Sequence, residues 1–183
     1  MMFQQESFSY TEDAIAQVVS LPYRGHDVSM LVVLPKGRDE LKKLEDQLTE
    51  ARLSGWLQSL TADRPVRLHL PRFQLASLFQ LADMLEAMGM TTAFKDSADF
   101  LAMSKSESLK ILQVIHQANV DVDEKGTEAA AATAVVMAPT ASPFAPEPKQ
   151  PVVFRADHPF LFLIRENRSG VILFLGRVAK AAL

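Results

Sequence analysis

The sequence contains no cysteine, which excludes disulfide bonds, thiol catalysis and thiolate metal sites. No apolar run approaches the ~20 residues that a membrane-spanning helix needs. Basic runs are also missing, and the net charge of −3 argues against nucleic acid or a membrane as partner. No metal-ligand spacing, glycine-rich phosphate loop, Gly-x-Ser-x-Gly turn or pair of catalytic carboxylates stands out. We therefore expect no enzyme activity, no metal and no cofactor.

What remains is the composition of an ordinary globular protein. The 183 residues suffice for one domain with a sizeable core, and 48% hydrophobic with 22% charged residues is typical of that class. The longest charged cluster, residues 38–43, alternates in sign and predicts a solvated helix face. No signal-peptide pattern follows Met1, and the compartment is left open.

Apolar periodicity predicts strands, then helices, then strands again. We expect strands over residues 14–21, 28–34, 66–75, 110–122, 154–165 and 171–178. Two helices are expected within residues 39–60, with Thr49 as the N-cap between them, and a third over residues 77–88 that ends at Gly89. Pro71 predicts an edge, a bulge or a bend in its strand. Without regular alternation of strands and helices, the order indicates an α+β fold with mostly antiparallel sheets and a few helices.

A run of almost only small residues, 127–134, follows the strand that is predicted to end at Val122. Helix propensity alone favours a helix here, because alanine is the best helix former. In a strand, alternate residues face opposite sides. One face would then carry only uncharged residues: Thr127, Ala129, Ala131, Thr133, Val135 and Met137. The other face would carry the only charge, Glu128, which fits a strand with one buried and one solvated side.

Several segments resemble the serpin family of serine protease inhibitors, in family order. They are Val32-Val33-Leu34-Pro35, Leu70-Pro71-Arg72-Phe73, residues 89–94 and 98–100, His116-Gln117-Ala118, residues 124–133, residues 154–162 and Phe174-Leu175-Gly176-Arg177-Val178. The resemblance covers nearly the whole chain but only the C-terminal half of a serpin domain. It implies a partial serpin-like fold over residues 1–183 that lacks the N-terminal helices and the first strands of the large A-sheet.

The resemblance also implies functional residues. The loop over about 124–151 resembles the reactive centre loop, with a hinge formed by Glu124, Gly126, Thr127, Glu128, Ala129, Ala130, Ala131, Ala132 and Thr133. His116 resembles the family's shutter histidine, which hydrogen-bonds beneath the opening A-sheet. Glu124 is expected to pair with Arg72 across neighbouring strands. In this family the loop acts as bait, is cleaved and inserts into the A-sheet as a new strand, and the serine nucleophile belongs to the protease.

The family's spacing from hinge to cut predicts the reactive bond. Counting Gly126 as the first of fifteen residues leads to Thr140, which places the bond at Thr140–Ala141. Met137 and Phe144 are alternative cut sites. The small side chains before the bond suit an elastase-like or subtilisin-like serine protease, and no Arg or Lys between positions 135 and 147 offers a trypsin-like pocket its cation.

Two other functions stay open at this stage. One is a non-inhibitory serpin-like scaffold, which the proline-rich stretch over residues 139–151 would suit. The other is a truncated, inactive serpin fragment. An N-terminal half on a separate chain would be a further partner, and the family's secreted members make an extracellular location an expectation.

Overall fold

The computed structural model describes residues 1–105, 107–123 and 150–180. These residues divide into two compact units. Unit 1 comprises residues 1–73 and 122–183, and unit 2 comprises residues 74–121. No helix among the described residues is both long enough and apolar enough to cross a membrane.

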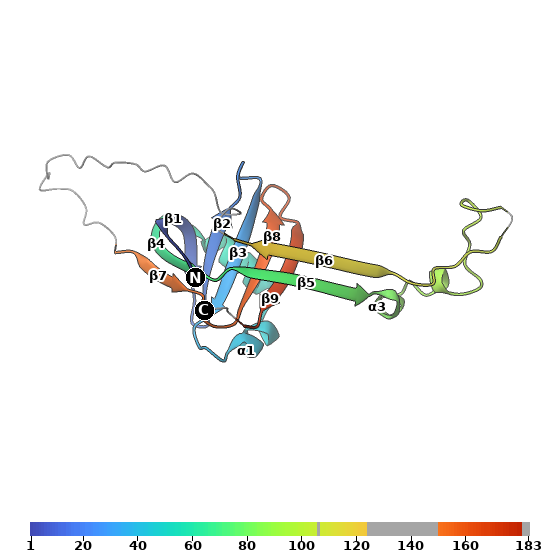
Figure 1. Cartoon of the computed structure of the whole chain (residues 1–183), viewed down its shortest axis with the longest axis horizontal. Helices are drawn as coiled ribbons and strands as arrows, with labels where there is room; N and C mark the ends of the chain where they lie inside the picture. Colours follow the sequence, from blue (N-terminus) through green and yellow to red (C-terminus); the bar gives the residue numbers. More distant parts are fainter. Residues whose placement is uncertain (106, 124–149, 181–183) are drawn as a thin grey trace, which may run out of the picture. The chain divides into compact units, whose positions relative to one another are not determined.

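Unit 1 is built on a seven-stranded sheet with the order β7-β4-β1-β2-β3-β8-β9 (Figure 1). Its strands are β1 (Met2–Glu12), β2 (Ala16–Pro22), β3 (Val28–Pro35), β4 (Thr61–Leu70), β7 (Val152–Arg155), β8 (Phe160–Glu166) and β9 (Ile172–Val178). All neighbouring strands are antiparallel except β4 and β7, which run parallel.

Two helices cover one face of the sheet centre. They are α1 (Leu41–Asp46) and α2 (Glu50–Ser59). Both are short and rely on burial for stability, because helices of this length are marginal alone. Leu44 and Trp56 are their buried residues, and they pack into a cluster with apolar side chains of β2, β3 and β8. The Thr49 hydroxyl accepts a hydrogen bond from the Arg52 N–H, which confirms Thr49 as the N-cap of α2.

The last strand of the sheet is an exposed apolar edge. β9 pairs with β8 on one side, and it is the last strand in the sheet order. Five consecutive apolar residues, Val171 just before β9 and the first four of the strand, are between 39% and 59% exposed: Val171, Ile172, Leu173, Phe174 and Leu175. Consecutive residues of a strand face opposite sides, so both faces of β9 are uncovered.

Unit 2 contains a two-stranded sheet of β5 (Phe73–Gln80) and β6 (Ile115–Val122), whose outermost residues Phe73 and Val122 fall in unit 1. The sequence that connects these strands contains α3 (Ala82–Ala87) and the 3-10 helix η1 (Thr92–Phe94). Gly89 follows α3 with φ +105°, which confirms it as the glycine that ends the helix. Leu78, Phe79, Leu112 and Ile115 are at least half exposed. A two-stranded sheet has too little core of its own to be stable alone, so these side chains mark surfaces that need cover.

The predicted α+β class with mostly antiparallel sheets is confirmed, while several element boundaries are wrong. The strand expected over residues 66–75 breaks at Pro71 into β4 and β5, as the proline predicted. The strand expected over residues 154–165 is two strands, separated by residues 156–159. The helix expected over residues 77–88 begins only at Ala82, because Leu78 belongs to β5. Strand β1 was not predicted.

Candidate functional site

The segment that carries the predicted hinge and reactive bond lies between two strands of this fold. Glu124, residues 126–133 and Thr140–Ala141 all fall within 124–149, outside the described residues, as do the alternative cut sites Met137 and Phe144. These assignments stay predictions. What the structure describes is the strand before the segment, β6, and the strand after it, β7.

Strand β6 offers a free edge. Within the described part of the chain, its only strand neighbour is β5, which leaves the N–H and C=O groups of its other edge without a partner strand. Such an edge can accept another strand through main-chain hydrogen bonds. Near the end of β6, Asp121 Oδ2 accepts a hydrogen bond from the Gln74 side chain of β5 over 2.7 Å. The two strands are therefore tied by a side-chain contact as well as by their ladder.

Two residues, His116 and Arg72, are expected to support this edge. His116 is on β6, its side chain is exposed, and its ring stacks on Phe79 of β5 with centroids 6.4 Å apart and planes at 25°. Its expected hydrogen bond beneath the A-sheet stays a prediction. Arg72 is exposed in the bend between β4 and β5, and its pairing with Glu124 also stays a prediction, because Glu124 is not described.

Strand β7 fixes the far end of the segment firmly. It pairs in parallel with β4, and Phe154 at its centre is completely buried. Burying a phenylalanine side chain contributes roughly 1.5–3 kcal/mol. The Ala156 N–H extends the contact by donating to the His69 carbonyl over 2.9 Å. Force on the preceding segment would therefore act on a strand that is held by backbone hydrogen bonds to β4 and by the burial of Phe154.

The turn after β7 is held by a cluster of charged side chains around Asp157. Its Oδ2 accepts from Arg38 Nη1 at 3.1 Å, and its Oδ1 lies 2.9 Å from His158 Nδ1. The other ring nitrogen of His158, Nε2, lies 2.7 Å from the Pro35 carbonyl oxygen at the end of β3. The hydrogen bond with His158, helped by the Arg38 guanidinium and opposed by partial burial, lowers the pKa of Asp157 below its ordinary value. The cluster connects the β7–β8 turn to β3.

Sequence reasoning missed this cluster. Arg38 is solvent-exposed as predicted, but its predicted place in a helix is wrong, because α1 begins only at Leu41 and Arg38 reaches Asp157. The charge alternation of residues 38–43 gave no hint of a partner 119 positions away. Only the order of strands in the sheet brings the end of β3 beside the β7–β8 turn.

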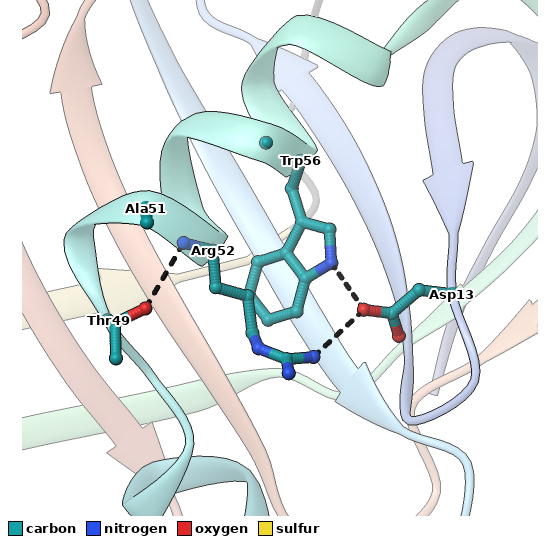
Figure 2. Close-up of a pocket in the computed structure, with 6 residues that line it drawn as sticks. Asp13, Thr49, Ala51, Arg52 and Trp56 are labelled. Atoms are coloured by element: carbon teal, nitrogen blue, oxygen red, sulfur yellow. Dashed lines mark hydrogen bonds and ion pairs between the residues drawn. The ribbon is translucent and has the colours of Figure 1, made fainter.

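The described residues also form an open pocket beside α2, lined by Asp13, Thr49, Ala51, Arg52, Gly55 and Trp56 (Figure 2). Asp13 Oδ2 accepts from the indole N–H of Trp56 at 2.9 Å and from Arg52 at 3.2 Å. Its Oδ1 accepts from the backbone N–H groups of Ile15 and Ala16. The polar groups of the pocket thus satisfy one another, and they join α2 to the β1–β2 turn.

The same contacts set the charge of Asp13. Partial burial alone would raise the pKa of its carboxyl, but the hydrogen bonds from the backbone and from Trp56, together with Arg52, outweigh it and lower the pKa. Asp13 is therefore an ionised structural group that holds α2, with no acceptor oxygen left to serve as a base.

Comparison with known proteins adds the family. The model of the serpin (serine protease inhibitor) family matches residues 1–181. Human Serpin B4 is 45% identical over 97% of this chain and 45% of its own length, and human leukocyte elastase inhibitor is 42% identical over 97% and 47%. The solved structure of uncleaved ovalbumin superposes with a TM-score of 0.79 at 34% identity, over 97% of this chain and 46% of ovalbumin. The chain thus spans about half the length of the relatives that it matches, and it belongs to the serpin family.

Proposed function

We propose that the protein is a suicide-substrate inhibitor of serine proteases, with Thr140–Ala141 as the reactive bond. Residues 1–183 would form the C-terminal half of a serpin domain, and 124–151 its reactive loop. The observation that carries the proposal concerns the two strands that flank the loop. Among the described residues, the strand before it, β6, has one edge without a partner strand, and the strand after it, β7, is paired with β4. Membership of a family whose printed description is serine protease inhibitor supports it.

In the proposed mechanism, the protease attacks the bond and the freed loop pairs with the open edge of β6. Each new ladder hydrogen bond contributes about 0.5–1.5 kcal/mol net. Over about ten bonds, the gain is on the order of 10 kcal/mol, comparable with the stability of a whole domain. That free energy can displace and deform the tethered protease before it completes hydrolysis. The uncleaved loop therefore holds the protein in a state of higher free energy, and cleavage allows the change to the inserted state.

The proposed target is an elastase-like or subtilisin-like serine protease. The small residues before Thr140 fit a shallow primary pocket, and the name of the similar leukocyte elastase inhibitor agrees with that choice. The comparisons give no support to the extracellular location that the resemblance suggested, and we propose no compartment.

The test is covalent trapping. The natural polypeptide that carries these residues is mixed with an elastase-like protease, and the products are separated in denaturant. We expect a complex that survives denaturation, with loop cleavage after Thr140. Simple digestion of the loop, with no trapped protease, would contradict the proposal.

A matched pair of hinge variants tests the insertion step. In the inserted strand, position 131 would face the buried side and position 132 the solvated side. Ala131→Arg should therefore turn the inhibitor into a substrate, because a cation cannot enter the packed face without a large cost. Ala132→Arg carries the same change and should still trap the protease. Equal trapping by both variants would show that the loop does not insert in this register.

A non-inhibitory scaffold is the second candidate, and one observation favours it. In the described residues β6 has a strand neighbour on one side only, so these residues alone do not form the gap between two strands that an inserted loop would enter. A thermal melt before and after loop cleavage separates the two functions. An inhibitor gains stability on cleavage because the loop becomes a strand, whereas a scaffold shows the same melting temperature in both forms.

An N-terminal half supplied as a separate chain is the remaining proposed partner. The uncovered residues of β9 and the half-exposed residues of unit 2 are the surfaces that it would cover. Size-exclusion chromatography of the 183-residue chain, with and without the N-terminal half of human leukocyte elastase inhibitor, tests this. A one-to-one complex supports the partner, and aggregation of the chain under both conditions supports the inactive fragment.

A further inference from the structure

Three exposed methionines lie in and just after the short helix α3 of unit 2 (Figure 1). Met84 is 57% exposed, Met88 79% and Met90 47%. The residues of this segment that are half-buried are instead Leu81 and Leu85, so the methionines are not the side chains that attach α3 to its unit. Three large apolar side chains that stay in water within seven positions call for a reason other than packing.

Helix geometry places two of the methionines side by side. Met84 and Met88 are four positions apart, and side chains at that spacing are neighbours, with Cβ atoms about 5–6 Å apart. The Met88 N–H donates to the Met84 carbonyl over 3.0 Å, so the helical turn between them is intact. A methionine side chain has three rotatable bonds. Two thioether sulfurs can therefore approach to about 4 Å, the separation required when both bind one ion at about 2.3 Å.

The end of the helix turns the third methionine back toward the first. The Met90 N–H donates to the Leu85 carbonyl, and the Gly89 N–H donates to the Glu86 carbonyl, both over 2.9 Å. With Gly89 at φ +105°, these two bonds make a Schellman motif. In such a motif the residue after the glycine commonly packs against the positions three and four residues inside the helix end, here Leu85 and Met84. The motif thus brings a third thioether within reach of the other two.

Three neutral thioethers suit a soft monovalent cation. Thioether sulfur selects Cu(I), whereas Mg²⁺ and Ca²⁺ take carboxylates and Zn²⁺ takes imidazoles or thiolates. Residues 82–90 include Asp83 and Glu86 and no Lys, Arg or His, and the last carbonyls of a helix also favour positive charge. Neither carboxylate is three or four positions from Met84 or Met88, so both attract an ion without lying on the methionine face.

We infer that Met84, Met88 and Met90 form a surface site for Cu(I), bound through three thioether sulfurs. The inference goes beyond protease inhibition and does not depend on it. The expectation of no metal rests on patterns of thiolate, imidazole and carboxylate ligands, which thioethers do not match. Because the Leu81 N–H donates to the Val114 carbonyl over 2.8 Å, the start of α3 is tied to the residue before β6. An ion that binds only the folded helix end should stabilise this connection between β5 and β6.

The test is anaerobic titration of Cu(I) into the 183-residue chain, in competition with a colorimetric Cu(I) chelator. The chain has no cysteine whose thiolate could compete. Met84→Leu, Met88→Leu and Met90→Leu should each weaken binding about 10-fold or more, since even changes around metal ligands cost about 10–100-fold. Leucine nearly conserves the volume, so the helix should stay folded. Met103→Leu is the matched control and should bind like the parent, because Met103 is 79% exposed in the same unit but outside the cluster.

The pH dependence separates a thioether site from a histidine site. Thioether sulfur takes up no proton, so the affinity for Cu(I) should be the same at pH 5 and pH 7, whereas a site of imidazoles weakens in acid. X-ray absorption at the copper edge should show sulfur neighbours at about 2.3 Å. No binding by the parent chain, an affinity that falls at pH 5, or parent-like binding by the variant with all three leucines would each overturn the site. None of these results would bear on protease trapping.

Discussion

Removing the Asp13 carboxylate should destabilise unit 1 far more than a typical surface substitution. Its oxygens accept hydrogen bonds from the N–H groups of Ile15 and Ala16, from the Trp56 indole and from Arg52. Water can replace the carboxylate at Arg52, but Trp56 is only 4% exposed and Ala16 is completely buried. Each of these two buried donors costs about 1–2 kcal/mol when it is left without a partner, and the bonds from Ile15 and Arg52 add a smaller amount. We expect Asp13→Ala to lower the free energy of unfolding by about 2–4 kcal/mol.

Urea unfolding measures this, with the fluorescence of the single tryptophan, Trp56, as the signal. With a denaturant slope of about 2 kcal/mol per molar, the midpoint should fall by about 1–2 M. Asp46→Ala is the matched control, because Asp46 pairs with Lys42 on the exposed side of α1 and should cost below about 0.5 kcal/mol. Asp13→Asn keeps one acceptor oxygen and should fall between the two. An Asp13→Ala midpoint equal to that of Asp46→Ala would refute the reasoning.

Three further predictions concern packing and pH. Gly176→Ala should lower the free energy of unfolding by about 1–3 kcal/mol, because the added Cβ would lie 2.6 Å from an aromatic ring on β8. Gly55→Ala on α2 is the matched control: its Cβ meets nothing within 4 Å, and it should raise the free energy of unfolding by about 0.5–1 kcal/mol. Phe154→Ala should cost about 3–5 kcal/mol in urea unfolding and expose the β7 segment to limited proteolysis, while the exposed Val153→Ala should do neither. Because the pKa of Asp157 is lowered in the folded state, its carboxylate stabilises the fold at pH values above the ordinary aspartate pKa. This stabilisation is lost as the pH falls through the folded-state pKa. Asp157→Asn should therefore make the free energy of unfolding depend less on pH in the acid range.

The parts of the fold that sequence predicted are those with strong local signals. The hairpin of β2 and β3 follows from two apolar runs around a turn, and the two helices are marked by Thr49 between leucine stripes. Strand β1 has no such signal, because its first half alternates little and carries Gln4, Gln5 and Glu6. Its strand state comes from pairing with β4 and β2, which local pattern does not reveal.

The candidate site divides in the same way. The alternation of residues 127–137 and the resemblance to serpins locate the loop, because both depend on contiguous sequence. The contacts of His69 and the Asp157 cluster depend on register between distant strands. His69 meets Phe3 on one side and Arg155 on the other only because β4 lies between β1 and β7. Such contacts become visible only when the order of strands is known.

That strand order has a consequence for synthesis on the ribosome. The apolar edge of β3, with Leu31, Val32 and Val33 all buried in the finished sheet, is covered by β8. Phe160, the first residue of β8, lies 125 positions after Pro35, the last residue of β3. At about 5–20 residues per second, translation leaves this edge unpaired for about 6–25 s. A nascent chain that exposes a β-branched edge for so long is open to pairing with other chains, and the sheet can close at this edge only after β8 has been synthesised.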